Sequence, residues 1–224
     1  MIAVAIDGPA GAGKSTIAKT AAKRLGFIYV DTGALYRSIG YYVIKQGKSL
    51  EIKEDIVSCL SSIDIEIEFV DNEQHVILNG EDVNASIRTP EVSIAASKVS
   101  AVPEVREFLL GLQRDFAKKY NCIMDGRDIG TVVLPNAEVK IFLTASCEER
   151  ANRRYKELIE KGEQVNYEDV LTDIQKRDYN DSHREIAPMK PAEDSVLVDS
   201  TGQSIEQNVQ AVIDVIKAKV PEIK

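Results

Sequence analysis

Residues 8–15 have the types and spacing needed to hold a nucleoside triphosphate. They fit the pattern G-x-x-x-x-G-K-[ST], in which glycines turn the backbone so that successive N–H groups point at a phosphate. The lysine of this pattern reaches the β- and γ-phosphates, and the hydroxyl reaches Mg²⁺. A glycine-rich turn that binds nothing is the alternative, but the strand-like run 2–6 and the helix-like stretch 14–25 on either side favour a phosphate site. The predicted ATP-binding residues are Gly8, Pro9, Ala10, Gly11, Ala12, Gly13, Lys14, Ser15 and Thr16.

A carboxylate at the end of another buried run could complete a metal site. Residues 122–125 read Cys-Ile-Met-Asp, so Asp125 ends a predicted strand of the same sheet. Kinases and nucleotide hydrolases place a carboxylate there to hold Mg²⁺, directly or through water. We therefore predict Ser15 and Asp125 as the metal site, with a turn cap as the alternative role of Asp125.

Four arginines follow predicted strand ends or lie along helices at the presumed cleft: Arg37, Arg127, Arg177 and Arg184. Ligands of parallel-sheet proteins bind outside the carboxyl ends of the strands, where the Arg127 head should emerge. Arg177, Asp181 and Arg184 are spaced i, i+4, i+7 and would share one face if their helix extends that far. A solvated stripe of ion pairs is the alternative for these three.

A second arginine group precedes the short connection 162–166. Arg150, Arg153 and Arg154 fall on one face of a predicted helix. On a mobile flap they would neutralise phosphates as the flap closed. An exposed basic helix face is the alternative.

The elements that must position these residues alternate between strand and helix. Alternation of this kind predicts a five-stranded parallel sheet covered on both faces, a three-layer α/β fold. An antiparallel module interrupts it at about 48–90, with period-2 alternation over 63–69, a turn at 71–73 and a hairpin turn at Asn79-Gly80. The predicted strands are 2–6, 27–30, 122–125, 139–143 and 196–198; the predicted helices are 14–25, 34–46, 90–100, 103–119, 146–161, 167–180 and one opening at the Ser204 capping box.

The composition restricts the possible partners. Twenty-eight Lys and Arg face 36 Asp and Glu, and a net charge of −8 disfavours a nucleic-acid surface. Three widely spaced cysteines indicate reduced thiols rather than disulfides or zinc. Without a run of 18 apolar residues we expect no membrane span, and because the chain enters its first strand at once we expect no signal peptide. The expected location is the cytoplasm.

Four blocks of this sequence together resemble the bacterial cytidylate kinases, nucleoside monophosphate kinases that phosphorylate CMP and dCMP. The resemblance covers nearly the whole chain and includes the long insertion between the second and third core strands. It implies one kinase domain with core 1–37 and 118–224, an acceptor-binding module at about 38–117 and a lid at about 155–167. It also implies ATP with Mg²⁺ and CMP or dCMP as ligands, and a monomer. The blocks are 7–16, 31–37, 125–131 and Arg177-Asp178.

The resemblance also implies roles for individual residues. Arg37, Arg127 and Arg177 would hold the acceptor's α-phosphate and, with Lys14, form the catalytic group. Thr32 stands where serine is frequent in the family and keeps the hydroxyl. The acceptor's cytosine would face Ser97, Arg106 and Asp128, and its sugar would face Asp181, Arg184 and Thr32.

Hydrogen-bond chemistry agrees with a cytosine acceptor. An ionised Asp128 only accepts and Arg106 only donates, which suits the N4 donor and the N3 and O2 acceptors of cytosine but not uracil. A thymidylate- or shikimate-type kinase is the alternative among enzymes. A GTPase-like switch is disfavoured because no N-K-x-D motif occurs, and a nucleic-acid ATPase is disfavoured by the charge.

Overall fold

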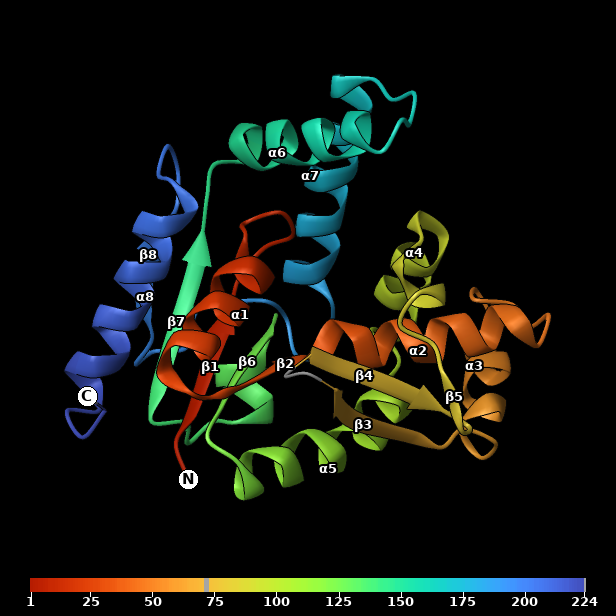
Figure 1. Ribbon diagram of the computed structural model, residues 1–224. Coiled ribbons are helices and arrows are strands. Elements are labelled where there is room, and N and C mark those ends of the chain that lie inside the picture. The colour runs from red at the N-terminus through yellow and green to blue at the C-terminus, as the bar shows by residue number, and fades with distance from the viewer. Residues whose placement is uncertain (71–72, 224) are drawn as a thin grey trace.

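The computed structural model describes residues 1–70 and 73–223 and has a five-stranded parallel sheet at its centre (Figure 1). The strand order is β2-β6-β1-β7-β8, and every neighbouring pair runs parallel. The predicted parallel α/β fold is confirmed. The strands are β1 (Ala3–Asp7), β2 (Ile28–Asp31), β6 (Cys122–Gly126), β7 (Val139–Thr144) and β8 (Val196–Asp199).

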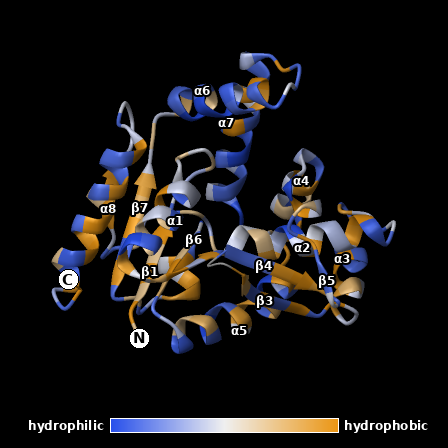
Figure 2. Ribbon diagram, viewed as in Figure 1, coloured by the Kyte–Doolittle hydropathy of each residue, from blue (hydrophilic) through white to orange (hydrophobic). Residues whose placement is uncertain are grey.

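The central strand β1 shows why the sheet is covered on both faces. All five of its residues are buried, and successive side chains point to opposite faces. Val4 and Ile6 pack in one cluster with α1 (Lys14–Leu25) and α8 (Ile205–Lys219), whereas Ala3 and Ala5 pack toward η2 (Ile129–Val133) and α5 (Pro103–Lys119). Figure 2 shows the hydrophobic residues concentrated in these strands and on the covering helices.

The inserted segment carries its own three-stranded antiparallel sheet and its own core. Asn79 and Gly80 both have positive φ, 50° and 80°, so they form the two-residue turn that the sequence predicts. The turn expected at 71–73 falls mostly on residues 71–72, outside the described residues. The sheet order is β3 (Ile65–Val70), β4 (Glu73–Leu78), β5 (Glu81–Asp82); beside it lie α2 (Thr32–Lys45), α3 (Lys53–Leu60), η1 (Ser86–Arg88) and α4 (Pro90–Val99).

Two helices in and before the insertion differ from the sequence-based expectation. The helix α3 is absent from that prediction, which describes 48–90 as a β module. Its eight residues bury only Ile56 and Cys59, so their periodic signal is weak. The helix α2 begins at Thr32 rather than Ala34, because the Asp31 carboxylate caps it by accepting the Ala34 N–H at 3.0 Å.

A pair of packed helices, α6 (Cys147–Glu160) and α7 (Tyr167–His183), stands beyond the carboxyl end of the sheet in Figure 1. The predicted caps are present, since Ser146 accepts the Glu149 N–H and Ser204 forms a capping box with Gln207. The helix α7 ends at His183, so Arg184 follows directly at its C-cap. Within the described part of the chain, no helix is long and apolar enough to cross a membrane.

Candidate active site

The phosphate loop leaves β1 and enters α1 in the conformation that its glycines allow. Gly11 and Gly13 have φ of 76° and 87°, and Gly13 is the N-cap of α1. A Cβ atom on Gly8 would lie 1.9 Å from the Leu143 carbonyl oxygen of β7, so only glycine permits this close approach. The strand–loop–helix arrangement predicted for residues 8–15 is therefore present, with backbone N–H groups at a helix N-terminus.

Lys14 is buried and folds back over this loop. Its Nζ donates to the Pro9 carbonyl at 2.8 Å. Burial, with the positive charges of Arg127 and Arg177, lowers the pKa of Lys14 to about 7, although nearby Asp125 favours its charged form. Burial therefore disfavours the charged form of Lys14, and an anion bound at this place would favour it.

Asp125, at the end of β6, accepts a hydrogen bond from a hydroxyl group on each of its carboxylate oxygens. Ser15 Oγ donates to Oδ2 at 2.8 Å, and the Tyr29 hydroxyl donates to Oδ1 at 3.0 Å. Burial and the neighbouring Asp31 charge raise the pKa of Asp125 to about 6, and the Lys14 charge opposes this. The sequence analysis assigned no role to Tyr29, because a tyrosine in a buried strand is distinguished from its apolar neighbours only by its hydroxyl group.

The donor atoms at Asp125 fit a hard cation. Mg²⁺ prefers oxygen ligands and keeps several from phosphate and water, so a single carboxylate and a hydroxyl suffice. Among the described residues no group of three or more His, Cys, Asp or Glu side chains could hold a metal by itself. The Ser15–Asp125 pair therefore suits an ion that arrives with a polyphosphate.

Of the three arginines predicted at the acceptor phosphate, Arg37 and Arg127 lie close enough to Arg177 to act on its charge. Burial and the charges of Arg127 and Arg37 lower the pKa of Arg177 to about 10, although Asp181 favours its charged form. Arg37 pairs with Asp31 at 2.7 Å, and Arg127 Nε donates to Asp181 at 2.9 Å. The Nε atoms of Arg37 and Arg177 are buried and have no hydrogen-bond partner within the residues that the structure describes.

Asp128, three residues beyond Asp125, is paired with guanidinium groups instead of hydroxyls. Arg106 of α5 pairs with its Oδ2, and Arg184 Nη2 donates to its Oδ1 at 3.0 Å. Burial raises the pKa of Asp128 while both arginines oppose the rise. The Arg106 guanidinium lies 5.7 Å from the centre of the Tyr36 ring. These contacts bring together α2, α5 and the end of α7.

An open cavity of about 360 Å³ adjoins this arginine-paired carboxylate. It separates α4 from the end of α7, and its lining includes Ser97 from α4 and Asp181 and Arg184 from the α7 side. Five of the six residues predicted for the base and sugar therefore lie at this cavity or form a hydrogen bond with one of its lining residues, since Asp128 pairs with Arg184 and Arg106 donates to the Ser100 carbonyl.

Asp7 is a buried carboxylate that sequence reasoning left without a role. It ends β1 and accepts the N–H groups of Ile129 and Gly130, each at 2.7 Å. Burial raises the pKa of Asp7 to about 6, although the two N–H donors oppose the rise. Asp7 thereby ties the strand before the phosphate loop to the turn that follows Asp128. Its position at a buried strand end is the signal that could have identified it.

Thr32 lies apart from the acceptor cavity. Its hydroxyl donates to the Asp125 backbone carbonyl at 2.7 Å, and only 2% of the residue is exposed. The hydroxyl predicted to lie near the sugar therefore braces β6 against the start of α2.

The arginines of α6 do not form one exposed basic face. Arg150 is buried, where it donates to the Ala10 carbonyl at 3.0 Å and pairs with Asp178 at 2.6 Å. Arg153 donates to the Ser200 carbonyl at 2.8 Å. Arg154 pairs with Glu157 on its own helix, and 36% of its side chain is exposed. Arg150 thus supports the phosphate loop from behind.

Known protein structures share this fold. A protein from Eubacterium ventriosum described as uncharacterized matches with a TM-score of 0.54 and 13% identity, covering 97% of this chain and 98% of that one. A gluconokinase from Sinorhizobium meliloti matches with a TM-score of 0.50 and 12% identity, covering 99% and 94%. At this level of identity the similarity concerns the fold alone.

Sequence comparison gives the family. The cytidylate kinase family model matches residues 4–218. A cytidylate kinase from Caldicellulosiruptor bescii is 55% identical over 95% of this chain and 94% of its own length, and one from Carboxydothermus hydrogenoformans is 52% identical over 96% and 97%. The chain therefore belongs to the cytidylate kinase family, enzymes that phosphorylate CMP or dCMP with ATP.

Proposed function

We propose that this chain transfers the γ-phosphoryl group of ATP to CMP or dCMP in the cleft between the phosphate loop and the Asp128 cavity. Phosphorylation of CMP or dCMP is the activity of its family. The observation that carries the assignment to this cleft is that Arg127 and Arg177 lie near the buried Lys14, while the Nε atoms of Arg37 and Arg177 are buried without a partner among the described residues. Two anions that repel each other need such a place to meet.

Charge and alignment supply most of the proposed catalysis. The acceptor phosphate is already a nucleophile near neutral pH, so no general base is required. Arg37, Arg127 and Arg177 would hold that phosphate. The buried Nε atoms of Arg37 and Arg177 offer donors that a phosphate oxygen can use. Because these groups are fixed and largely shielded from water, their charge acts strongly on the transferring group.

The donor would bind along residues 8–16. Lys14 would exchange the Pro9 carbonyl for a phosphate oxygen. Ser15 and Asp125, the latter directly or through water, would hold the Mg²⁺ of the ATP complex. The ion would neutralise part of the charge on the β- and γ-phosphates.

The acceptor base and sugar would occupy the cavity between α4 and α7. Asp128 would accept a hydrogen bond from the cytosine N4 amino group, and Arg106 would donate to the N3 and O2 acceptors. Ser97 lines the same cavity. Uracil presents the opposite donor and acceptor at two positions and would leave a buried group unpaired. Asp181 and Arg184, which line this cavity, would meet the sugar. Thr32, whose hydroxyl donates to the Asp125 carbonyl, would support β6 instead.

We further propose that the core spans 1–37 and 118–224, with an acceptor-binding module at 38–117 and a lid at 155–167. Lid closure would bring Arg153 and Arg154 toward ATP while Arg150 supports the loop. We expect a monomer that works in the cytoplasm, where Cys59, Cys122 and Cys147, free in the structure, would stay reduced.

An acceptor panel tests the assignment. ADP release would be measured with CMP, dCMP, UMP, AMP, dTMP and shikimate, each with Mg²⁺ and ATP. We expect the highest kcat/KM with CMP or dCMP, and a value at least about 100-fold lower with UMP, the discrimination available from an unpaired buried polar group. A preference for any acceptor without cytosine would refute the base assignment, and slow hydrolysis that no acceptor stimulates would favour a nucleotide-dependent switch.

A further inference from the structure

A glutamine of the inserted sheet, Gln74 on β4, pairs with the main chain at the end of β2. Its Oε1 accepts the Asp31 N–H at 2.7 Å, and its Nε2 donates to the Asp31 carbonyl at 3.2 Å. In the described chain β2 is an edge strand, hydrogen-bonded in its sheet to β6 alone. The outer N–H and C=O groups of an edge strand lack partners in the sheet. The Gln74 amide thus replaces one peptide group of a further strand.

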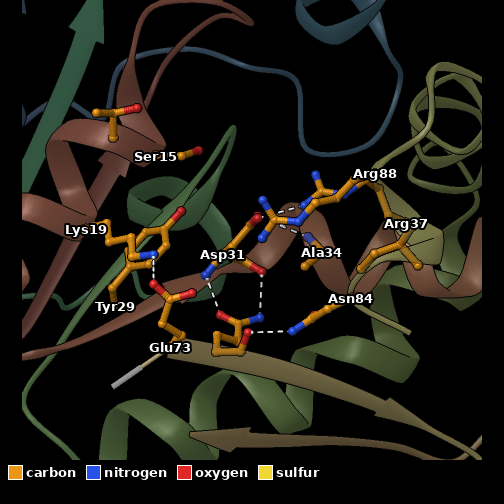
Figure 3. A pocket seen from close by; sticks show the side chains of 12 residues that line it. Ser15, Lys19, Tyr29, Asp31, Ala34, Arg37, Glu73, Asn84 and Arg88 are labelled. Carbon is orange, nitrogen blue, oxygen red and sulfur yellow. Dashed lines mark hydrogen bonds and ion pairs between the residues drawn. The ribbon is translucent and has the colours of Figure 1, made fainter. Parts of the chain in front are cut away.

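Asp31, the residue that Gln74 contacts, also forms an ion pair with Arg37, an arginine predicted at the acceptor phosphate. The Asp31 carboxylate caps α2 through the Ala34 N–H at 3.0 Å and pairs with Arg37 at 2.7 Å, as Figure 3 shows. The position of the Asp31 carboxylate depends on the position of the Asp31 main chain, which Gln74 fixes. Gln74 therefore acts on the Arg37 guanidinium through a single intervening residue.

Gln74 is itself fixed by the loop that follows β5. Asn84 Nδ2 donates to the Gln74 carbonyl at 2.9 Å, while Asn84 Oδ1 accepts the Val76 N–H at 3.2 Å. One amide thus fixes two alternate residues of β4. These contacts border a cavity of about 200 Å³ between α1, β2 and β4, which also opens onto Ser15 and Arg37 (Figure 3).

A neighbouring contact between the core and β4 has a different character. Lys19 of α1 pairs with Glu73 at 2.6 Å, but the two side chains are 51% and 61% exposed. Exposed pairs of this kind contribute little, because solvent screens them. The partly buried amide pairing at Gln74 is therefore the better candidate for fixing the inserted sheet against β2.

We propose that Gln74 is a positioning residue that couples the placement of the inserted sheet to Arg37 and so sets the affinity for the acceptor's phosphate. This rests on the proposed function, which assigns Arg37 to that phosphate. The role differs from a general contribution to stability because it should act on one substrate only. In the proposed function ATP would bind along residues 8–16, whereas the hydrogen bonds that fix Gln74 go to Asp31 and Asn84.

Gln74→Met tests the role, since methionine keeps a similar shape and removes both amide groups. We expect the KM for CMP to rise about tenfold, below the roughly hundredfold that a 1 Å misplacement can cost, with kcat and the KM for ATP within about twofold. Glu73→Gln is the matched control. It removes the exposed pair with Lys19 from the adjacent position, and all three constants should stay within about twofold.

A double-mutant cycle asks whether Gln74 acts through Arg37. CMP binding would be measured by calorimetry in the wild type, Gln74→Met, Arg37→Met and the double variant. If the effect passes through Arg37, Gln74→Met should weaken binding about tenfold in the wild type and hardly at all in Arg37→Met. An equal loss in both backgrounds would overturn the proposal, as would equal increases in the KM values of CMP and ATP.

Hydrogen exchange of the Asp31 amide gives a readout independent of activity. Exchange should be faster in Gln74→Met than in the wild type and unchanged in Glu73→Gln, because only the first variant removes the acceptor of that N–H. Unchanged exchange in Gln74→Met would contradict the proposal. If the wild type does not phosphorylate CMP, the proposed function is refuted. If the wild type is active but Gln74→Met has the same KM for CMP and the same amide exchange as Glu73→Gln, only the positioning role is refuted.

Discussion

Two carboxylates three residues apart lie at the carboxyl end of β6, Asp125 within the strand and Asp128 just beyond it, and their surroundings differ in kind. Both are almost completely buried, with 4% and 5% of the residue exposed. Asp125 receives hydroxyl groups from Ser15 and Tyr29. Asp128 is paired with the guanidinium groups of Arg106 and Arg184. Burial raises the pKa of each, so the partners rather than the depth make the difference.

The two kinds of partner leave the carboxylates with different chemistry. A hydroxyl donates a hydrogen bond but brings no charge, so Lys14 is the nearby positive charge that favours ionised Asp125, and the carboxylate could also accept the cation of the proposed function. Two guanidinium groups neutralise Asp128 within the protein and fix its orientation. The first arrangement suits binding of a metal complex. The second suits reading a pattern of hydrogen-bond donors and acceptors.

Asp125→Asn should have the largest effect on turnover. The amide keeps the shape but removes the charge, so the proposed Mg²⁺ site would lose its carboxylate and keep only the Ser15 hydroxyl. We expect kcat to fall about 10² to 10³-fold, the range for losing one preorganised electrostatic group, while CMP affinity stays within about threefold. ADP release and CMP calorimetry measure the two quantities. Equal losses in kcat and CMP affinity would show that the two carboxylates do not have separate roles.

Asp128→Asn should change selectivity more than turnover. The new N–H₂ group can donate to uracil, and the lost charge weakens the contact with the cytosine amino group. We expect the ratio of kcat/KM for CMP to that for UMP to fall about 30-fold or more, since each mismatched buried contact costs about 2 kcal/mol. The ratio cancels any general loss caused by leaving Arg106 and Arg184 without their partner. An unchanged ratio would show that Asp128 does not read the base.

The fold and the phosphate loop could be predicted because local signals determine them. The octet 8–15, with the apolar run before it and the helical stretch after it, specifies a strand, turn and helix, and Asn79-Gly80 specifies a hairpin. The helix α3 escaped prediction because packing of two side chains, rather than a strong periodic pattern, stabilises it. The sequence therefore predicts an element best where the backbone conformation, such as a positive φ, requires particular residue types such as glycine or asparagine.

The partners of the site residues could not be predicted, since they come from distant parts of the chain. The spacing of Arg150, Arg153 and Arg154 indicates a shared helix face, yet Arg150 contacts the phosphate loop 140 residues away. The Ser15–Asp125 bond spans 110 residues and rests on the register of β1 against β6. One sequence gives the residue types at a site, but only the packed sheet determines which of them touch.

Asp7 extends the comparison to a buried carboxylate that backbone N–H groups hold. Burial raises its pKa from 3.8 to about 6, so the folded state favours the protonated form more than the unfolded chain does. Protonated Asp7 therefore contributes about 3 kcal/mol to the free energy of unfolding below about pH 4, and this contribution is lost as the pH rises through 6. In Asp7→Asn, the free energy of unfolding should fall less steeply from pH 4 to 7 than in the wild type.

Chemical unfolding at several pH values measures this slope. The exposed carboxylate of Asp64 offers a matched control, and Asp64→Asn should leave the slope close to that of the wild type. If Asp7→Asn retains the full slope, Asp7 ionises as readily in the folded protein as in the unfolded chain, and burial is not the main influence on it.

Tyr29→Phe should have the smallest effect and tests the hydroxyl side of the comparison most directly. It removes one donor from Asp125 and leaves Ser15 in place, which costs about 1 kcal/mol for a single hydrogen bond, or about fivefold in kcat/KM. The selectivity for CMP over UMP should not change, because Asp128 keeps both arginines. A change of selectivity in Tyr29→Phe would mean that the two carboxylates act as one connected network. In that case the difference between their partners would not separate metal binding from base recognition.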